Sequence, residues 1–399
     1  MDIELFRNTP TGELATITGT SPGVGDWEHV AFLPDRLDEV GPELSGVAYR
    51  HVAEARAALA ALDATAQRLP NPGLFRHSAL RLEAQSTAAL EGTYEPLARV
   101  LAADTETVSD PGMREVLNYV DIAETAYAWT QEGRPWSVSG ISELHHRLMA
   151  GTPGEREYRG LRPNQVVVGV RDNLGDERVP IKTARYIPPP PGSDLEARLA
   201  DLLAWEEAGP RPEIDPVVAA AMVHYTFEAL HPFHDGNGRL GRLLVVLQLQ
   251  RWGVLAEPTL TVSPWFEARR AQYYDALFGV STVGDWSTWV SFFAEGLAVS
   301  ARRTQAQMLA LVRVQAELKA TVEASRLRSR NAHALIDVAM SHPTFTIPEA
   351  AEALGMRYQG AQKLIDSLTA LDVLAPLDGR TYARRYHSPR VMAILLGRE

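Results

Sequence analysis

Apolar residues recur at three- and four-residue spacings over most of this 399-residue chain, and this periodicity narrows the choice of folds more than any other pattern. It predicts amphipathic helices over residues 44–68, 78–90, 111–129, 139–149, 194–207, 215–230 and 285–326. Asp215 followed by Pro216 is typical of a helix start, and Gly92 is expected to cap the second helix at its C-terminal end. The sequence therefore predicts a mainly α-helical protein.

One region departs from helical periodicity. Residues 165–168 and 182–187 are β-prone runs on either side of a polar turn at residues 172–176, and they predict a β-hairpin. Four consecutive prolines, Pro188 to Pro191, follow it. Proline neither continues a helix nor pairs in a central strand, so a stiff extended segment is expected there.

The last seventy or so residues are expected to form a separate module. Residues 346–349 read as a capping box that opens a helix, which Gly355 ends, and a second helix is predicted over residues 357–371. Leu377 to Arg380 offers a hairpin turn. Helix, turn, helix and β-wing is the pattern of a winged helix-turn-helix domain, here residues 331–399.

The charge of the chain bears on its partners. It has 39 Lys and Arg against 50 Asp and Glu, a formal net charge of −11, so nucleic acid is not its default partner. Residues 331–399 hold seven basic and seven acidic side chains. That module has no basic excess, which a DNA-binding domain usually shows, yet Arg380, Arg384 and Arg385 cluster at its expected wing. DNA binding and protein recognition or dimer formation therefore both stay open for it.

The chain contains no cysteine, which excludes disulfides, thiolate metal sites and a cysteine nucleophile. Its acidic N-terminus leads into no apolar segment typical of a secretory signal, and no apolar stretch is long enough for a membrane span. We therefore expect a soluble, cytoplasmic protein with no membrane partner.

Residues 231–242 carry the strongest chemical signal: His-Pro-Phe-His-Asp-Gly-Asn-Gly-Arg-Leu-Gly-Arg. This is a glycine-rich loop between two predicted helices, and a helix N-terminus reached through such a loop is a favourable anion site. Gly236 and Gly238 let the backbone approach a phosphate closely. Arg239 and Arg242 are three residues apart, so both guanidinium groups can reach one polyphosphate.

Two further side chains complete the set of groups that phosphoryl or nucleotidyl transfer requires. Asp235 offers a hard oxygen ligand for Mg²⁺, and His231 can accept a proton near neutral pH. The alternative is a metal cluster of the His-Asp phosphohydrolase kind at His231, His234 and Asp235. It would need further ligands such as His145, His146 and His224, and it gives no role to Asn237 or to the two arginines.

The segment matches every specified position of the motif H-x-F-x-(D/E)-G-N-G-R-x-x-R, and through it the chain resembles the Fic family over roughly residues 30–300. The resemblance implies a helical Fic catalytic core, placed at residues 105–325. Gly160-Leu161-Arg162 with the following hairpin resembles the family's target-docking flap. The implied enzyme is a nucleotidyltransferase, a protein adenylyltransferase that moves AMP from ATP to a Ser, Thr or Tyr hydroxyl of a target protein or of itself.

The resemblance also implies a role for each motif position. His231 would deprotonate the target hydroxyl, and Asp235 would hold Mg²⁺. Arg239 would bind the α- and β-phosphates, and Arg242 the γ-phosphate. The anion hole would be formed by Gly236, Asn237 and Gly238. The protein substrate would dock on the flap hairpin. Formation of a homo-oligomer and binding of DNA by the winged helix are both left open.

An upstream segment resembles the family's inhibitory pattern (S/T)-x-x-x-E-(G/N). Thr87 and Glu91 occupy its specified positions, and their four-residue spacing places both on one helical face. Residues 1–104 are therefore expected to be an N-terminal helical region whose inhibitory helix lets Glu91 compete for Arg242. The rival reading is a DNA-binding regulator whose Fic core serves as a nucleotide sensor.

Overall fold

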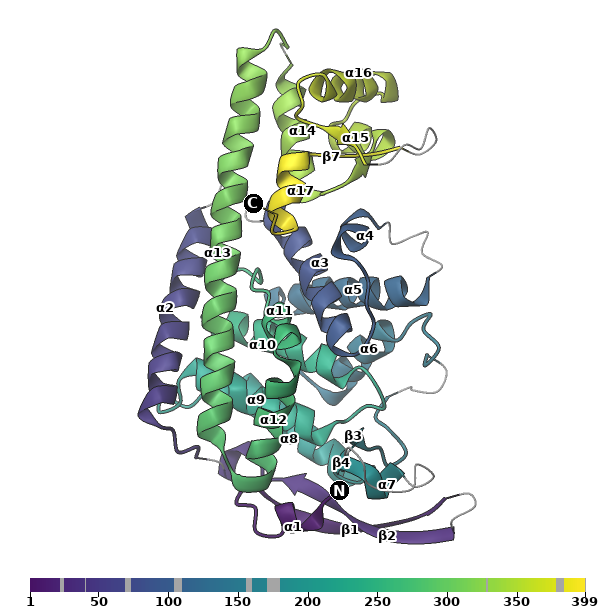
Figure 1. Ribbon diagram of the computed structural model, residues 1–399, viewed down its shortest axis with the longest axis vertical. Coiled ribbons are helices and arrows are strands. Elements are labelled where there is room, and N and C mark those ends of the chain that lie inside the picture. The colour runs from purple at the N-terminus through teal and green to yellow at the C-terminus, as the bar shows by residue number, and fades with distance from the viewer. Residues whose placement is uncertain are drawn as a thin grey trace. The chain divides into compact units, whose positions relative to one another are not determined.

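The computed structural model describes residues 1–21, 25–39, 41–68, 73–103, 110–155, 160–170, 180–327, 329–377 and 384–398. As expected, the chain is mainly helical (Figure 1). It divides into two compact units. The first comprises residues 1–59, 118–255 and 265–299, and the second comprises residues 60–117, 256–264 and 300–399. Among the described residues, no helix combines the length and the apolar character needed to cross a membrane.

The helices of the first unit are α1 (Ile3–Phe6), α6 (Val138–Leu148), α7 (Pro180–Thr183), α8 (Ser193–Ala208), α9 (Pro216–Leu230), α10 (Asn237–Arg251) and α12 (Arg270–Val283). Four more helices contribute to both units: α2 (Gly46–Arg68), α5 (Pro111–Gln131), α11 (Ser263–Ala268) and α13 (Trp286–Ala324). The centre of this unit is the pair α9 and α10, which pack against each other and are buried on almost every face. α9 is apolar on nearly every side, as expected for a buried helix, whereas α10 also buries Arg239, Arg242 and Gln248.

The helix boundaries follow the sequence signals. All predicted helices are found, and their ends agree with prediction within two residues except at α3 (Gly73–Leu90), which begins five residues early. Asp215 caps α9 by accepting a hydrogen bond from the Val217 N–H at 2.8 Å, as predicted. Gly92 has a φ of +99°, a left-handed conformation, and the Thr93 N–H returns to the Ala88 carbonyl at 3.0 Å, which ends α3.

The N-terminal region contains β structure that its helical description omitted. β1 (Gly12–Ser21) and β2 (Gly25–Pro34) form a two-stranded antiparallel ribbon. Its buried residues are Ile17 in β1 and the last four residues of β2, where the Phe32 N–H donates to the Ile187 carbonyl at 2.9 Å. Most of the ribbon is not buried, so its strands do not need the alternation of apolar and polar residues that marks a half-buried strand. This explains why the pattern of the sequence did not reveal it.

Part of the predicted hairpin is present in the first unit. β3 (Val168–Val170) pairs antiparallel with β4 (Ala184–Tyr186), while the predicted turn at residues 172–176 lies outside the described residues. The run from Lys182 does not begin as a strand, because Pro180 opens the short helix α7 instead.

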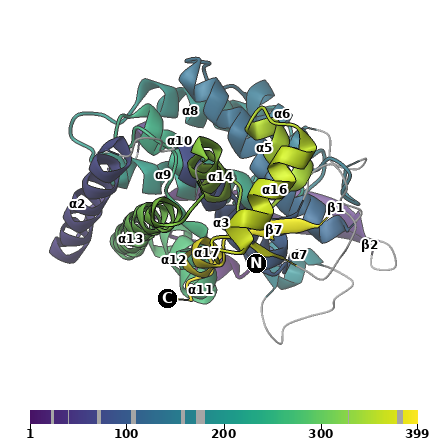
Figure 2. The same cartoon turned by 90° about the horizontal axis from the view of Figure 1, so that it is seen from above.

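The second unit contains α3, α4 (Leu97–Ala102), α14 (Arg330–Ser341), α15 (Ile347–Ala353), α16 (Tyr358–Thr369) and α17 (Pro389–Leu395). A small antiparallel sheet has the strand order β5 (Phe345–Thr346), β7 (Arg385–His387), β6 (Ala375–Pro376). Its central strand, β7, is labelled in Figures 1 and 2. The predicted capping box at the start of α15 is confirmed, and Gly355 follows that helix with a φ of +60°. The predicted turn at residues 378–380 lies outside the described residues, and the winged helix-turn-helix assignment stays a prediction.

Candidate active site

The motif forms the connection between α9 and α10. His231 ends α9 in a left-handed conformation, with φ 46° and ψ 58°, and its N–H donates to the Phe227 carbonyl at 3.1 Å. Gly236 precedes α10 with a φ of +79°. Gly241 lets the two helices approach closely, because a Cβ there would lie 2.7 Å from Glu228 Oε1. The connection is therefore short and sterically determined.

Asn237 closes this loop with its side chain. Its Oδ1 accepts from the Phe233 N–H at 2.9 Å, and its Nδ2 donates to the Phe233 carbonyl at 2.9 Å. The asparagine is 2% exposed. The side-chain amide therefore satisfies the Phe233 N–H and carbonyl, two backbone groups that the tight turn would otherwise leave without hydrogen bonds. The predicted anion hole would accordingly draw on the backbone at this position, since the side chain is committed to the loop.

His145, on α6, supports the same loop from another element. Its ring stacks on the Phe233 ring at a centroid distance of 4.0 Å and an interplanar angle of 7°, and its Nε2 lies 3.0 Å from the Asp235 carbonyl. Burial lowers the pKa of His145 to about 4, so the imidazole is neutral at pH 7 and Nε2–H donates to that carbonyl. Sequence reasoning gave this histidine only a structural or metal-ligand role.

Arg162 contacts the loop from the segment that precedes β3. Its Nε donates to the His231 carbonyl at 2.8 Å, and its backbone N–H donates to the Pro232 carbonyl at 3.0 Å. The residue is 2% exposed. In the sequence, only the position of Arg162 at the end of the flap-like segment Gly160-Leu161-Arg162 indicated a function for it.

The start of α10 is built to receive negative charge. Among the described residues no side chain caps this helix, and the Leu240 N–H, bonded to the Gly236 carbonyl at 3.1 Å, makes the first bond of the helical ladder. Arg239 and Arg242 follow within one turn, and each is 1% exposed. Guanidinium groups and the positive end of a helix both favour the binding of anions.

Asp235 is the exposed acid of this site. Its side chain is 52% exposed, and its Oδ1 accepts from the Gly236 N–H at 2.6 Å and lies 3.2 Å from Arg239 Nη2. His231 is half-buried, and His234 is exposed, as expected for a variable motif position. The structure thus brings the predicted residues 231–242 together around one helix start.

The histidines required by the metal-cluster alternative are engaged elsewhere. His224 is buried, its Nε2 lies 2.8 Å from the Tyr273 hydroxyl, and burial, together with the charge of Arg242, lowers its pKa to about 3. His145 holds the loop, as described above. No group of three or more His, Asp or Glu side chains within the described ranges could hold a metal ion.

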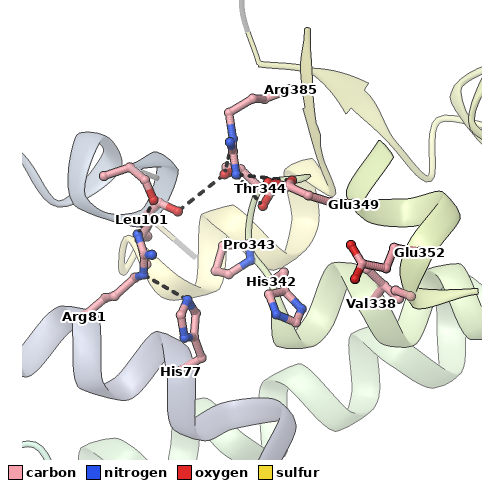
Figure 3. A pocket seen from close by; sticks show the side chains of 12 residues that line it. His77, Arg81, Leu101, Val338, His342, Pro343, Thr344, Glu349, Glu352 and Arg385 are labelled. Atoms are coloured by element: carbon pink, nitrogen blue, oxygen red, sulfur yellow. Dashed lines mark hydrogen bonds and ion pairs between the residues drawn. The ribbon is translucent and has the colours of Figure 1, made fainter. Parts of the chain in front are cut away.

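Thr87 and Glu91 lie at the C-terminal end of α3, in the second unit, whereas the motif lies in the first. Thr87 is buried, and the Glu91 N–H donates to the Ala88 carbonyl at 3.0 Å. The second unit also holds a cavity of about 470 Å³ between α3, α4 and the C-terminal elements (Figure 3). Its lining includes His77, Arg81, His342 and Arg385 but no motif residue, so it is distinct from the candidate active site.

The helical core and the glycine-rich loop with its histidine and paired arginines are similar to those expected from the resemblance to the Fic family. Residues 135–249 match the Fic/DOC family, and residues 49–128 match the Fic/DOC family N-terminal region. The two matched segments lie within residues 49–249, and the motif at residues 231–242 falls in the second of them.

Two relatives and one solved structure give the range of similarity. The chain is 32% identical over 174 residues to protein adenylyltransferase fic-1 of Caenorhabditis briggsae, which covers 44% of this chain and 30% of that protein. It is 28% identical over 214 residues to protein adenylyltransferase Fic of Drosophila mojavensis, covering 53% and 37%. The chain thus spans about a third of the length of these curated relatives.

A Fic family protein from Desulfovibrio desulfuricans has a similar fold. Its crystal structure matches 88% of this chain and 98% of its own, with a TM-score of 0.52 and 22% sequence identity. At this identity the match shows the fold alone.

Proposed function

We propose that this chain is a protein adenylyltransferase that transfers AMP from ATP to a Ser, Thr or Tyr hydroxyl of a target protein and of itself. The observation that carries the proposal is the α9–α10 connection, where a histidine, a helix start without a side-chain cap and two buried arginines occur within residues 231–242. The names of the similar proteins, protein adenylyltransferases, support the same reaction. The DNA-binding regulator is not favoured by these similarities.

In the proposed reaction, the triphosphate of ATP lies against the N-terminus of α10 and the guanidinium groups of Arg239 and Arg242. His231 takes the proton of the target hydroxyl, and the hydroxyl oxygen attacks the α-phosphorus. A bond forms between that oxygen and the phosphorus as the bond to the oxygen bridging toward the β-phosphate breaks. Pyrophosphate leaves with the displaced electron pair, and the backbone N–H groups at Gly236 to Gly238 stabilise the charge on the α-phosphate, with the Gly236 N–H exchanging Asp235 Oδ1 for the phosphate.

The donor set suits Mg²⁺ as the cofactor. Magnesium in nucleotide sites is usually held by one or two carboxylates together with substrate phosphates. Asp235 is an exposed carboxylate beside the anion site, and only its Oδ1 is bonded to the protein in the contacts described above. We propose that Asp235 holds the ion, which would shield the phosphate charge from the attacking oxygen.

Incubation of the purified chain with ATP labelled at the α-phosphate tests this reaction. Covalent label should appear on the wild type and fall by roughly 10² to 10⁴ in the His231→Ala variant, as expected for loss of a positioned base. His234→Ala is the matched control, because it removes an exposed histidine of the same loop. Equal labelling of wild type and His231→Ala, or transfer of a γ-phosphate label instead, would contradict the proposal.

We further propose that Glu91 inhibits transfer by competing with the γ-phosphate for Arg242, with Thr87 supporting it from the same helical face. Two unit charges about 4 Å apart attract by roughly 4 kcal/mol at an effective dielectric near 20, before desolvation is subtracted. A fraction of this energy would misplace the triphosphate. Glu91→Gly should therefore raise self-labelling strongly, and Glu91→Gly combined with Arg242→Ala should not. Equal labelling of wild type and Glu91→Gly would contradict the inhibitory role alone.

The remaining proposals concern recognition. The β3–β4 pair would dock the main chain of the target by strand addition, and the C-terminal module would be a winged helix-turn-helix domain that recognises protein or DNA. Deletion of residues 331–399 should leave the transfer chemistry intact, because all proposed site residues precede it. A folded truncated chain that cannot label itself would contradict this division.

A further inference from the structure

Arg162 has a set of partners that its place in the sequence does not explain. Within the described part of the chain, every hydrogen bond of its guanidinium goes to a backbone carbonyl. Nε donates to His231 at 2.8 Å, and Nη1 donates to Asn164 at 3.3 Å. Nη2 donates to Pro189 and, at 3.5 Å, to Leu230. A buried arginine is therefore used wholly to fix the course of the backbone.

The charge of this arginine is retained despite its burial. Burial lowers the pKa of Arg162 to about 10, which leaves the guanidinium protonated at neutral pH. Removing a cation from water is costly unless its donors are satisfied, and the planar guanidinium offers five N–H donors in a fixed fork. Lysine carries the same charge as a point donor on a flexible stem and cannot serve these carbonyls together.

The carbonyls that Arg162 binds surround the residue proposed as the base. His231 is one of only two described residues other than glycine with a positive φ, at 46°. Left-handed conformations cost non-glycine residues about 1 to 3 kcal/mol and persist where the surroundings determine them. Arg162 bonds the carbonyls of Leu230, His231 and Pro232, and so holds the peptides on both sides of His231.

The same arginine also binds the two ends of the β3–β4 segment. Asn164 precedes β3 and Pro189 follows β4, so their bonds to Arg162 join the base of this segment. Tyr186, in β4, adds a second tie, because its hydroxyl donates to the Ala229 carbonyl at 2.8 Å. The backbone of His231 and the base of the β3–β4 pair are therefore held by one side chain.

We propose that Arg162 is a positioning residue that fixes the His231 backbone relative to the β3–β4 pair, so that the imidazole meets a target hydroxyl docked there. This inference rests on the proposed function. Arg162 itself touches neither nucleotide nor target. Its loss should thus affect the transfer rate and leave nucleotide affinity unchanged, because the start of α10 and its arginines keep their own contacts.

Arg162→Lys in the full chain tests the proposal, with Arg198→Lys as the matched control. Arg198 is another largely buried arginine of the first unit, which donates to the Pro34 carbonyl at 2.8 Å and pairs with Asp194, and neither of these partners belongs to the loop. Both variants are made in the Glu91→Gly chain, and self-labelling is measured at saturating ATP. We expect Arg162→Lys to lower the rate by about 10²-fold, the effect of a misplacement near 1 Å. The affinity for a non-hydrolysable ATP analogue, measured by calorimetry, should match that of the control.

A second readout does not depend on transfer. In ¹⁵N-histidine NMR spectra, the ring signals of His231, assigned by their loss in His231→Ala, should shift or broaden in Arg162→Lys and stay in place in Arg198→Lys. If the Glu91→Gly chain transfers no label, the proposed function has failed, and these spectra still decide the role of Arg162. A folded Arg162→Lys variant with unchanged His231 signals would overturn the inference. So would an equal loss of rate in Arg198→Lys.

Discussion

Replacing Asn237 by alanine should open the loop that carries His231 while leaving the rest of the first unit folded. The substitution removes two hydrogen bonds of 2.9 Å, both to the backbone of Phe233. A net hydrogen bond contributes about 0.5 to 1.5 kcal/mol, and a buried group left without its partner costs about 1 to 3 kcal/mol. With two such groups at Phe233, we expect the closed loop to lose about 2 to 4 kcal/mol, which makes its opening roughly 30- to 10³-fold more frequent.

Amide hydrogen exchange measures this opening directly, because the Phe233 N–H is itself one of the lost donors. Exchange at Phe233 should quicken by the stated factor in Asn237→Ala, whereas the Ala219 amide at the start of α9 should keep its protection. Tyr225→Phe is the control, since it removes one buried hydrogen bond of 2.9 Å to Ser281 elsewhere in the unit. Unchanged protection of Phe233 in Asn237→Ala would refute the reasoning and would mean that His145 and Arg162 suffice to hold the loop closed.

Three further predictions concern stability, each measured on the full chain. Glu206 is buried 3.8 Å from Arg251 Nε, and neither of its oxygens accepts a hydrogen bond from the described residues. Burial raises its pKa to about 8, so the folded state is most stable below about pH 4.5 and loses this stability as the pH rises toward 8. Glu206→Gln should flatten this dependence in unfolding midpoints between pH 5 and 9. Gly241→Val should destabilise by about 1 to 3 kcal/mol in urea, because its Cβ would lie 3.2 Å from the Phe227 ring and 3.3 Å from the His224 ring, which are both buried. Thr346→Ala should lose about 1 kcal/mol through the capping box with Glu349, and an unchanged urea midpoint in either case would contradict the packing or capping argument.

The local features of this chain could be predicted because their causes are local. The N-cap at Asp215 and the capping box at Thr346 depend on residues two or three apart, and both are found. The helix ends agree closely for the same reason. The motif could be placed between two helices because its glycines and the apolar run after it mark where one helix stops and the next begins.

The parts that escaped prediction depend on partners distant in the chain. The β1–β2 ribbon is defined by pairing between its strands and carries little apolar periodicity. His145 meets the Asp235 carbonyl across 90 positions, and Arg162 meets the His231 carbonyl across 69. A backbone carbonyl has no residue identity, so nothing in the motif indicates which side chain will bind it. Such partners can be found only once the fold has brought them together.

The shape of the motif depends both on contacts within it and on contacts from residues outside it. Asn237 is the motif residue that closes the loop from within, whereas His145 and Arg162 hold it from outside. The left-handed backbone at His231 is unfavourable in itself, so the twelve residues of the motif are not expected to keep this shape in isolation. The chemistry is therefore encoded locally and its geometry is encoded by the surrounding fold. If the proposed function holds, a chain that keeps every residue of the motif but has no hydrogen-bond donor at position 162 should bind nucleotide and transfer it slowly.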